Sequence, residues 1–139
     1  MYKKILHGLD GSECGFKALE AAIALAKVLD AELHTISVEE VPHYPGAIGE
    51  VIEEKGTANS KFSKAVVRAR DMAGAQGIGI RSHVVVGHEV KSMVEFIKAN
   101  NYDLLVIGFM GHSALYDRVM GSTCQSLVRL APCAVLVVK

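Results

Sequence analysis

The stretch Val106-Ile107-Gly108-Phe109-Met110-Gly111-His112-Ser113, with its continuation Met120-Gly121-Ser122-Thr123, decides the fold. The apolar run 104–107 predicts a short buried strand that ends at Gly108. Gly111 follows after two residues, Gly121 comes after nine more, and a helical pattern begins at Ser122. The N–H groups and the dipole at a helix start attract an anion, and glycines let the backbone approach it closely. The stretch therefore predicts a strand, an anion-binding loop and a helix.

This spacing matches neither of two common phosphate-binding motifs. The P-loop pattern G-x-x-x-x-G-K-[ST] is absent, and so is the dinucleotide fingerprint G-x-G-x-x-G. The stretch is therefore neither a P-loop nor a dinucleotide-binding turn.

Length and charge limit the class of protein. A chain of 139 residues is expected to form a single domain, 1–139. Fifteen Lys and Arg balance fifteen Asp and Glu, which argues against nucleic acid or an anionic membrane as the main partner. Half of the residues are hydrophobic, as in a parallel sheet covered on both faces. Apolar surface kept for a subunit interface is a second explanation.

The cysteines and histidines suggest no special chemistry. Cys14, Cys124 and Cys133 are odd in number and lack C-x-x-C spacing, so we expect reduced thiols that pack in a cytoplasmic protein. The six histidines show no metal-ligand spacing. No apolar run has the length of a membrane span, and the turn at 8–10 comes too early for a signal peptide. We expect a cytoplasmic location and no membrane partner.

Apolar periodicity predicts five strands that alternate with four helices. The expected strands cover 2–9, 32–38, 80–86, 103–107 and 133–139, and the expected helices cover 13–29, 59–73, 90–100 and a segment from 122. Asp10 is expected to cap the first helix in a capping box with Glu13. Residues 39–57 are expected to form a mobile flap. The alternation predicts an α/β fold with a doubly wound parallel sheet and right-handed crossovers. Ligands bind such sheets beyond the carboxyl ends of the strands.

Both ends of the sequence resemble one family. Lys4-Ile5-Leu6 followed by Leu9-Asp10-Gly11-Ser12-Glu13 is similar to the opening of universal stress proteins. Gly108-x2-Gly111-x9-Gly121-Ser122, followed by Ala131-Pro132-Cys133 and a Val-rich strand, is similar to their close. The resemblance runs the whole chain. It implies a five-stranded sheet in the order 3-2-1-4-5 with helices on both faces, and a homodimer through the C-terminal strand. In the branch with this glycine pattern it also implies bound ATP, with or without Mg²⁺.

The resemblance also implies roles for individual residues. Leu9 and Asp10 match the positions that hold adenosine, and Val38 matches a main-chain contact to adenine. Ile107 and Gly108 match the floor of the ribose and phosphate pocket. The implied phosphate positions are Gly111, Gly121 and Ser122, and the neighbouring candidates are His112 and Thr123.

The sequence departs from the family pattern at the implied phosphate positions. Cys124 stands where the family often has a hydroxyl, and Phe109-Met110 replace small or polar residues. Tyr116-Asp117 replace basic residues, and Asp117 would repel a triphosphate unless a metal intervenes. The sequence therefore predicts nucleoside recognition more strongly than phosphate binding.

Three functions stay open. The first is a stress-linked sensor or regulator that binds ATP or a related adenine nucleotide and acts on an unknown protein partner. The second is a homodimeric interaction protein whose glycine loop is vestigial, its glycines forming plain turns and Asp10, Ser122 and Thr123 serving only as helix caps. The third is a slow ATPase or phosphotransferase, because no catalytic group is evident in the sequence. A receiver domain is excluded, since Asp10 stands alone after the first strand and no aspartate ends the third.

Overall fold

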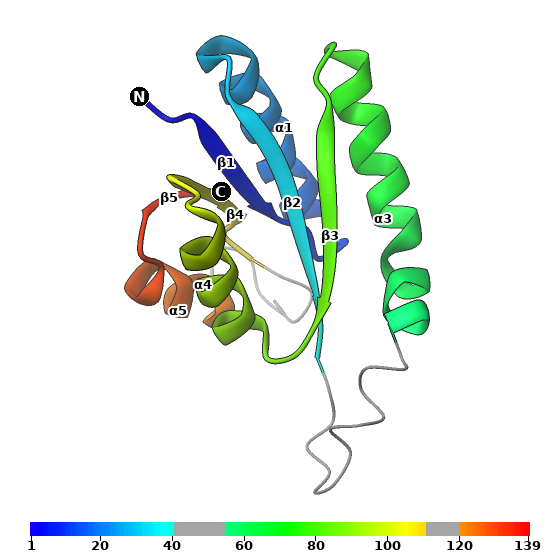
Figure 1. The fold of residues 1–139 in the computed structure, drawn as a ribbon, viewed down its shortest axis with the longest axis vertical. Helices are drawn as coiled ribbons and strands as arrows, with labels where there is room; N and C mark the ends of the chain where they lie inside the picture. Colours follow the sequence, from blue (N-terminus) through cyan, green and yellow to red (C-terminus); the bar gives the residue numbers. More distant parts are fainter. Residues whose placement is uncertain (41–54, 111–119) are drawn as a thin grey trace, which may run out of the picture.

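The computed structural model of the protein describes residues 1–40, 55–110 and 120–139, without the side chains of 55–61. Strands and helices alternate along the chain as the sequence predicts (Figure 1). The elements are β1 Lys4–Gly8, α1 Glu13–Leu29, β2 Glu32–Glu39, α3 Lys55–Ala75, β3 Ile80–Val86, α4 Glu89–Asn100, β4 Leu104–Gly108, α5 Ser122–Leu130 and β5 Ala134–Val138. Within these ranges, no helix is long and apolar enough to cross a lipid bilayer.

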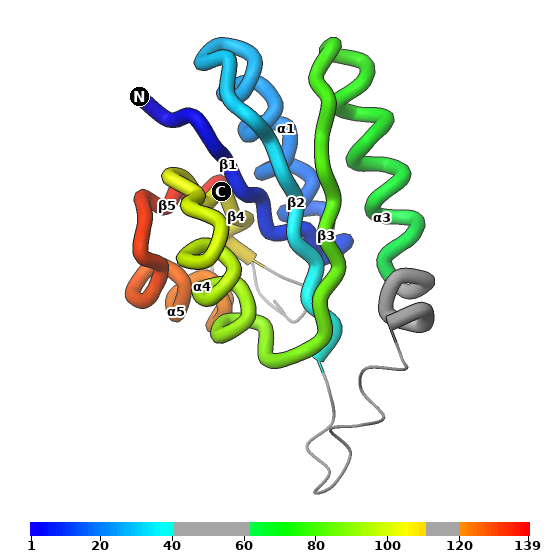
Figure 2. The backbone as a smooth tube through the Cα atoms, viewed as in Figure 1, coloured from blue at the N-terminus to red at the C-terminus, as the bar shows by residue number. Residues whose placement is uncertain are grey.

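The five strands form one parallel sheet in the order β3-β2-β1-β4-β5, which confirms the predicted fold. β1 is the central strand, where Leu6 pairs with His34 of β2 and with Leu105 of β4. The chain first moves outward through β2 to β3 and then crosses back to β4 and β5 (Figure 2). The strand order therefore reverses between β1 and β4, where a parallel sheet opens a crevice at its carboxyl edge.

Helices cover both faces of the sheet, as predicted. On one face, Ile5 of β1 packs in a cluster with Leu19 and Ile23 of α1 and with Ala69 of α3. On the other face, the next residue of β1, Leu6, packs with residues of α4 and α5, among them Ile97 and Leu127. Successive strand residues point to opposite faces, so a strand covered on both sides is mostly apolar. This accounts for the high apolar content of the chain.

The cap of α1 differs from the predicted one. The helix has its predicted bounds, but Ser12 caps it, because Ser12 Oγ accepts a hydrogen bond of 3.0 Å from Gly15 N. Asp10 Oδ1 accepts from Ser12 N at 2.9 Å and from Ser12 Oγ at 2.6 Å. Glu13 pairs with Arg68 of α3 at 2.8 Å. The prediction of Asp10 as the cap is wrong; Asp10 instead braces the residue that caps.

The expected flap is bounded too widely. Glu39 is the last residue of β2, and α3 begins at Lys55, before the expected start at Asn59. Between β2 and α3, only residues 41–54 lie outside the described part of the chain. β1 and β5 are shorter than predicted, because the outermost residues of each predicted range are not paired with a neighbouring strand. Helix and strand ends commonly differ by such small margins.

Candidate functional site

A cavity of about 310 Å³ lies at the carboxyl ends of β1, β2 and β4, where the strand order reverses. Its wall contains eight of the ten predicted site residues: Leu9, Asp10, Val38, Ile107, Gly108, Gly121, Ser122 and Thr123. The other two, Gly111 and His112, lie outside the described residues. The topology thus gathers predicted residues from both ends of the chain around one space.

Backbone hydrogen bonds place the start of α5 at the end of β4. Phe109 N donates to Val138 O at 2.9 Å, and Phe109 O accepts from Gly121 N at 2.9 Å. Gly121 is the N-cap residue of α5 and provides no side-chain hydrogen bond to it. Ser122 and Thr123, considered as caps, are instead the first two residues of the helix. The first N–H groups of an uncapped helix favour an anion.

Gly108 is required by packing. A Cβ at this position would lie 2.9 Å from the carbonyl oxygen of Cys14, so any side chain would push the first turn of α1 away from β4. The sequence predicted a ligand-binding role for Gly108, and the packing contact with Cys14 was not predicted. Gly15 has a similar role that sequence reasoning missed, because its Cβ would lie 2.7 Å from Asp10 Oδ1.

The inner wall of the cavity is apolar. Leu9 N continues the β1–β2 ladder by donating to Ile36 O at 2.8 Å, and Ser37 Oγ donates to Leu9 O at 2.7 Å. These bonds fix the peptides on either side of Leu9. The remaining apolar side chains of the wall come from β2, β4, three helices and the segment after β4: Ile36, Val38, Phe62, Met93, Ile107, Met110 and Leu127. An apolar wall with fixed backbone groups suits a flat heterocycle.

The residues that depart from the family pattern divide into three groups. Met110 and Cys124 line the cavity. Phe109 is not among its described lining; its ring centroid lies 5.5 Å from Lys139 Nζ. Tyr116 and Asp117 lie outside the described residues.

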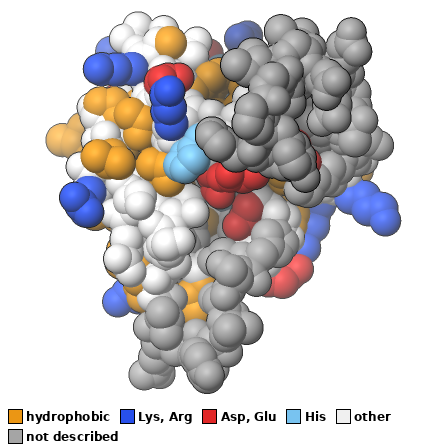
Figure 3. Space-filling model, turned by 90° about the horizontal axis from the view of Figure 1, so that it is seen from below, with side chains coloured by type: hydrophobic (Ala, Val, Ile, Leu, Met, Phe, Trp, Pro, Cys, Tyr) orange, Lys and Arg blue, Asp and Glu red, His pale blue; other side chains and the backbone are white. Residues whose placement is uncertain are grey.

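The mouth of the cavity is acidic. Asp10, Glu40 and Glu89 belong to the lining, and the described part of the lining holds no Lys, Arg or His. The face of the molecule beyond the ends of β2 and β3 shows acidic side chains grouped at its centre (Figure 3). Glu40 Oε1 accepts from Glu89 N at 3.0 Å, so Glu40 satisfies an N–H group at the start of α4.

Glu89 is held inside this acidic group. Burial raises the pKa of its carboxyl, and Asp10 and Glu40 raise that pKa further, whereas a hydrogen bond from Thr123 and the nearby His88 lower it. Sequence reasoning missed Glu40 and Glu89. Each lies just beyond the carboxyl end of a strand, which was the available signal. Among the described residues, no group of three His, Cys, Asp or Glu side chains is arranged to hold a metal ion.

The sequence and the fold both have close counterparts. The sequence pattern of the universal stress protein family matches residues 1–139. Universal stress protein MJ0531 of Methanocaldococcus jannaschii is 32% identical, over 100% of this chain and 83% of its own length. Universal stress protein YxiE of Bacillus subtilis is 28% identical over 100% of both chains.

Solved structures agree with the sequence matches. A universal stress protein solved in complex with cAMP is 27% identical, with a TM-score of 0.75 over 99% of this chain and 97% of its own. The universal stress protein UspA from Lactobacillus plantarum shares the fold with a TM-score of 0.85 over 99% of this chain and 98% of its own, at 22% identity. A match over the full length of the chain, together with a relative at 32% identity, shows that this protein belongs to the universal stress protein family.

Proposed function

We propose that the chain binds an adenine nucleoside or nucleotide in the cavity between β1 and β4 and acts as a stress-linked sensor or regulatory protein. The observation that carries the proposal is that the uncapped start of α5 at Gly121 borders the same cavity as the apolar wall around Leu9 and Val38. One end of the cavity therefore suits a base and the other suits a phosphate. The related protein solved with cAMP supports the same class of ligand.

Each part of the ligand has a counterpart in the wall. Adenine would pack against Leu9, Val38 and Ile107, with main-chain groups of β2 near its edge. The ribose hydroxyls would donate to the carboxylate of Asp10, which two hydrogen bonds from Ser12 hold in place. The phosphate would accept from the first N–H groups of α5 and from Ser122.

We propose binding rather than rapid turnover. Phosphoryl transfer requires cations that neutralise charge on the transferring group. The described lining of the cavity offers carboxylates and no Lys or Arg. Slow hydrolysis of ATP remains the alternative activity of this site, and release of phosphate over hours would measure it.

Calorimetry with adenosine, cAMP, AMP and ATP tests the proposal. Wild-type protein should bind at least one of them, and Gly121→Val should lose binding, because a side chain there would obstruct the approach of the ligand to α5. The variant should fold, since Gly121 has φ −63° and ψ 149°, a conformation open to every residue.

Gly79→Val is the matched control. A Cβ at Gly79 would meet nothing within 4 Å, and Gly79 is not part of the described cavity wall, so this variant should bind as wild type does. Absence of both heat and thermal shift with all four ligands at millimolar concentration, ATP also with Mg²⁺, would contradict the proposal. An interaction protein with an empty cavity would then be the better description.

A further inference from the structure

Glu89 reaches the place where a phosphate is expected. It is the first residue of α4, and Thr123 is the second residue of α5. Both residues line the cavity. A hydroxyl in the first turn of a helix is a natural partner for a ligand phosphate. Here that hydroxyl shares the cavity wall with a carboxylate of the protein itself.

The charged side chains in the described part of the cavity wall are all acidic. Asp10 follows β1, Glu40 follows β2 and Glu89 begins α4, so three elements bring carboxylates to one side of the cavity. His88 precedes Glu89 and bonds to Lys91 N at 3.4 Å as the cap of α4. Exposed Lys91 belongs to the same turn but not to the described cavity wall.

We propose that Glu89 determines the specificity of the cavity: its carboxylate, in the same wall as Asp10, Glu40 and the start of α5, repels ligand phosphates, so that the cavity favours an adenine nucleoside or a singly charged cyclic nucleotide over free ATP. The inference rests on the proposed function and names the ligand class within it. A phosphate must displace or neutralise the Glu89 carboxylate, whereas the ribose and adenine positions are unaffected.

The magnitude of the effect follows from Coulomb repulsion. Two like charges several ångströms apart in a partly buried site repel by about 1–2 kcal/mol, which is roughly a tenfold change in affinity. Adenosine carries no charge and is indifferent to Glu89. Free ATP carries several negative charges and is strongly disfavoured. The ratio Kd(ATP)/Kd(adenosine) therefore isolates the electrostatic effect from the packing of the base.

The test is calorimetry of adenosine, cAMP and ATP in EDTA, which removes divalent cations that would shield the phosphates. Glu89→Gln keeps the size of the side chain and removes its charge. We expect the ratio Kd(ATP)/Kd(adenosine) to fall about tenfold in this variant, with adenosine affinity unchanged. Glu95→Gln is the matched control: it makes the same change on an exposed position of α4 and should leave the ratio as in wild type.

An unchanged ratio in folded Glu89→Gln overturns the inference, as does an equal fall in Glu95→Gln. If Glu89→Gln does not fold, Glu89→Ala decides in its place, because it also removes the carboxylate and alanine is the residue most favourable to a helix. The same fall in the ratio supports the inference, and a constant ratio overturns it. Wild type that binds none of the ligands refutes the proposed function itself, whereas binding with a constant ratio refutes only the role of Glu89.

Discussion

Single residues at the start of α1 couple the fold to the candidate site. Gly15 N donates to Ser12 Oγ, and Gly15 O accepts a 2.8 Å hydrogen bond from Nε2 of the buried His7. Ser12 in turn holds Asp10. A change at Gly15 therefore reaches a predicted ligand residue without touching the ligand.

Gly15→Ala should destabilise the protein, although alanine normally favours a helix over glycine. The added Cβ would lie 2.7 Å from Asp10 Oδ1 and 3.1 Å from Ser12 Oγ, and overpacking of this kind costs about 1–3 kcal/mol. Gly74→Ala in α3 is the control, because its Cβ would meet nothing within 4 Å; it should stabilise by up to about 1 kcal/mol. Urea unfolding measures the change in the free energy of unfolding for both variants. A gain in stability for Gly15→Ala would refute the packing argument.

The acid sensitivity of the fold should depend on His7. Burial lowers the pKa of His7 to about 4, from an ordinary value of 6.5. Below pH 6.5 the unfolded chain takes up a proton that the folded chain does not accept until about pH 4. Stability should therefore be complete above pH 6.5 and fall by about 3 kcal/mol as the pH drops to about 4. His7→Gln, whose amide can still donate to Gly15 O, should show a smaller loss in urea unfolding at several pH values.

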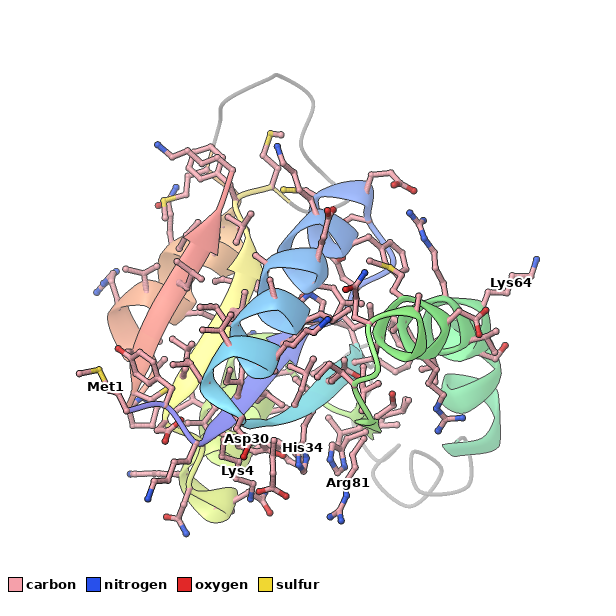
Figure 4. The ribbon with its side chains drawn as sticks, turned by 90° about the horizontal axis from the view of Figure 1, so that it is seen from above. Met1, Lys4, Asp30, His34, Lys64 and Arg81 are labelled. Carbon is pink, nitrogen blue, oxygen red and sulfur yellow. The ribbon has the colours of Figure 1, made fainter. Side chains whose placement is uncertain are left out.

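A pair of histidines, His34 and His83, contributes to the same loss of stability in acid. His34 Nδ1 lies 3.0 Å from His83 Nε2 and 2.8 Å from Tyr102 Oη. The two imidazole rings are tilted by only 15°, with centroids 5.3 Å apart, so they lie edge to edge and share one N–H···N hydrogen bond. Burial is the main cause that lowers the pKa of both His34 and His83, and the nearby Arg81 lowers both further (Figure 4). If His7→Gln lost as much stability at low pH as wild type does, the loss would be attributed to the His34–His83 pair.

At the scale of elements, local signals predicted some bounds better than others. α1, β3 and the start of α5 lie where predicted, because Ser12, Gly87 and Gly121 mark them in the sequence. The start of α3 was predicted late, since no apolar stripe marks Lys55. The cap of α1 was misassigned, because Asp10 and Ser12 are both good caps and only the turn geometry decides between them.

The ends of α1 and α4 provide a test at this scale. Asp30 and Asn101, the C-cap residues, adopt left-handed backbone conformations with φ of 52° and 56°. Glycine adopts this conformation without strain, and a carboxylate at a helix C-terminus opposes the helix dipole. Asp30→Gly should therefore raise the free energy of unfolding by about 0.5–1 kcal/mol. Asn101→Gly should gain less, because asparagine tolerates the conformation better. Equal gains for both variants in urea unfolding would contradict the contribution of charge.

At the scale of the whole molecule, the alternation of elements predicted a parallel sheet, while the strand order came from the family resemblance. The order brings Leu9, Val38 and Gly121 around one cavity. The acidic mouth was not predicted, because Glu40 and Glu89 are far apart in sequence and meet only through the pairing of β2 with β3. Residue types indicate where a ligand can bind, whereas the charge around it depends on tertiary structure.

The free edge of β5 supports the predicted homodimer, which remains a proposal. Among the described strands, β5 pairs with β4 on one side and with none on the other. Leu136 is 37% exposed, whereas Val137 packs in the core cluster beneath α4 and α5. An apolar sheet edge of this kind invites strand pairing, and a two-fold axis would cover both copies at once.

Leu136→Lys should separate the dimer without disturbing the core, which makes it a cleaner change than Val137→Lys. Light scattering at tens of micromolar protein should give twice the 14.9 kDa chain mass for wild type and the single mass for the variant. Val67→Lys is the control, because Val67 is 56% exposed on α3, and α3 covers the sheet on the side of β3, at the opposite edge from β5. That variant should stay dimeric. A wild-type protein that scatters as a monomer would leave the β5 edge uncovered and remove the basis for the homodimer.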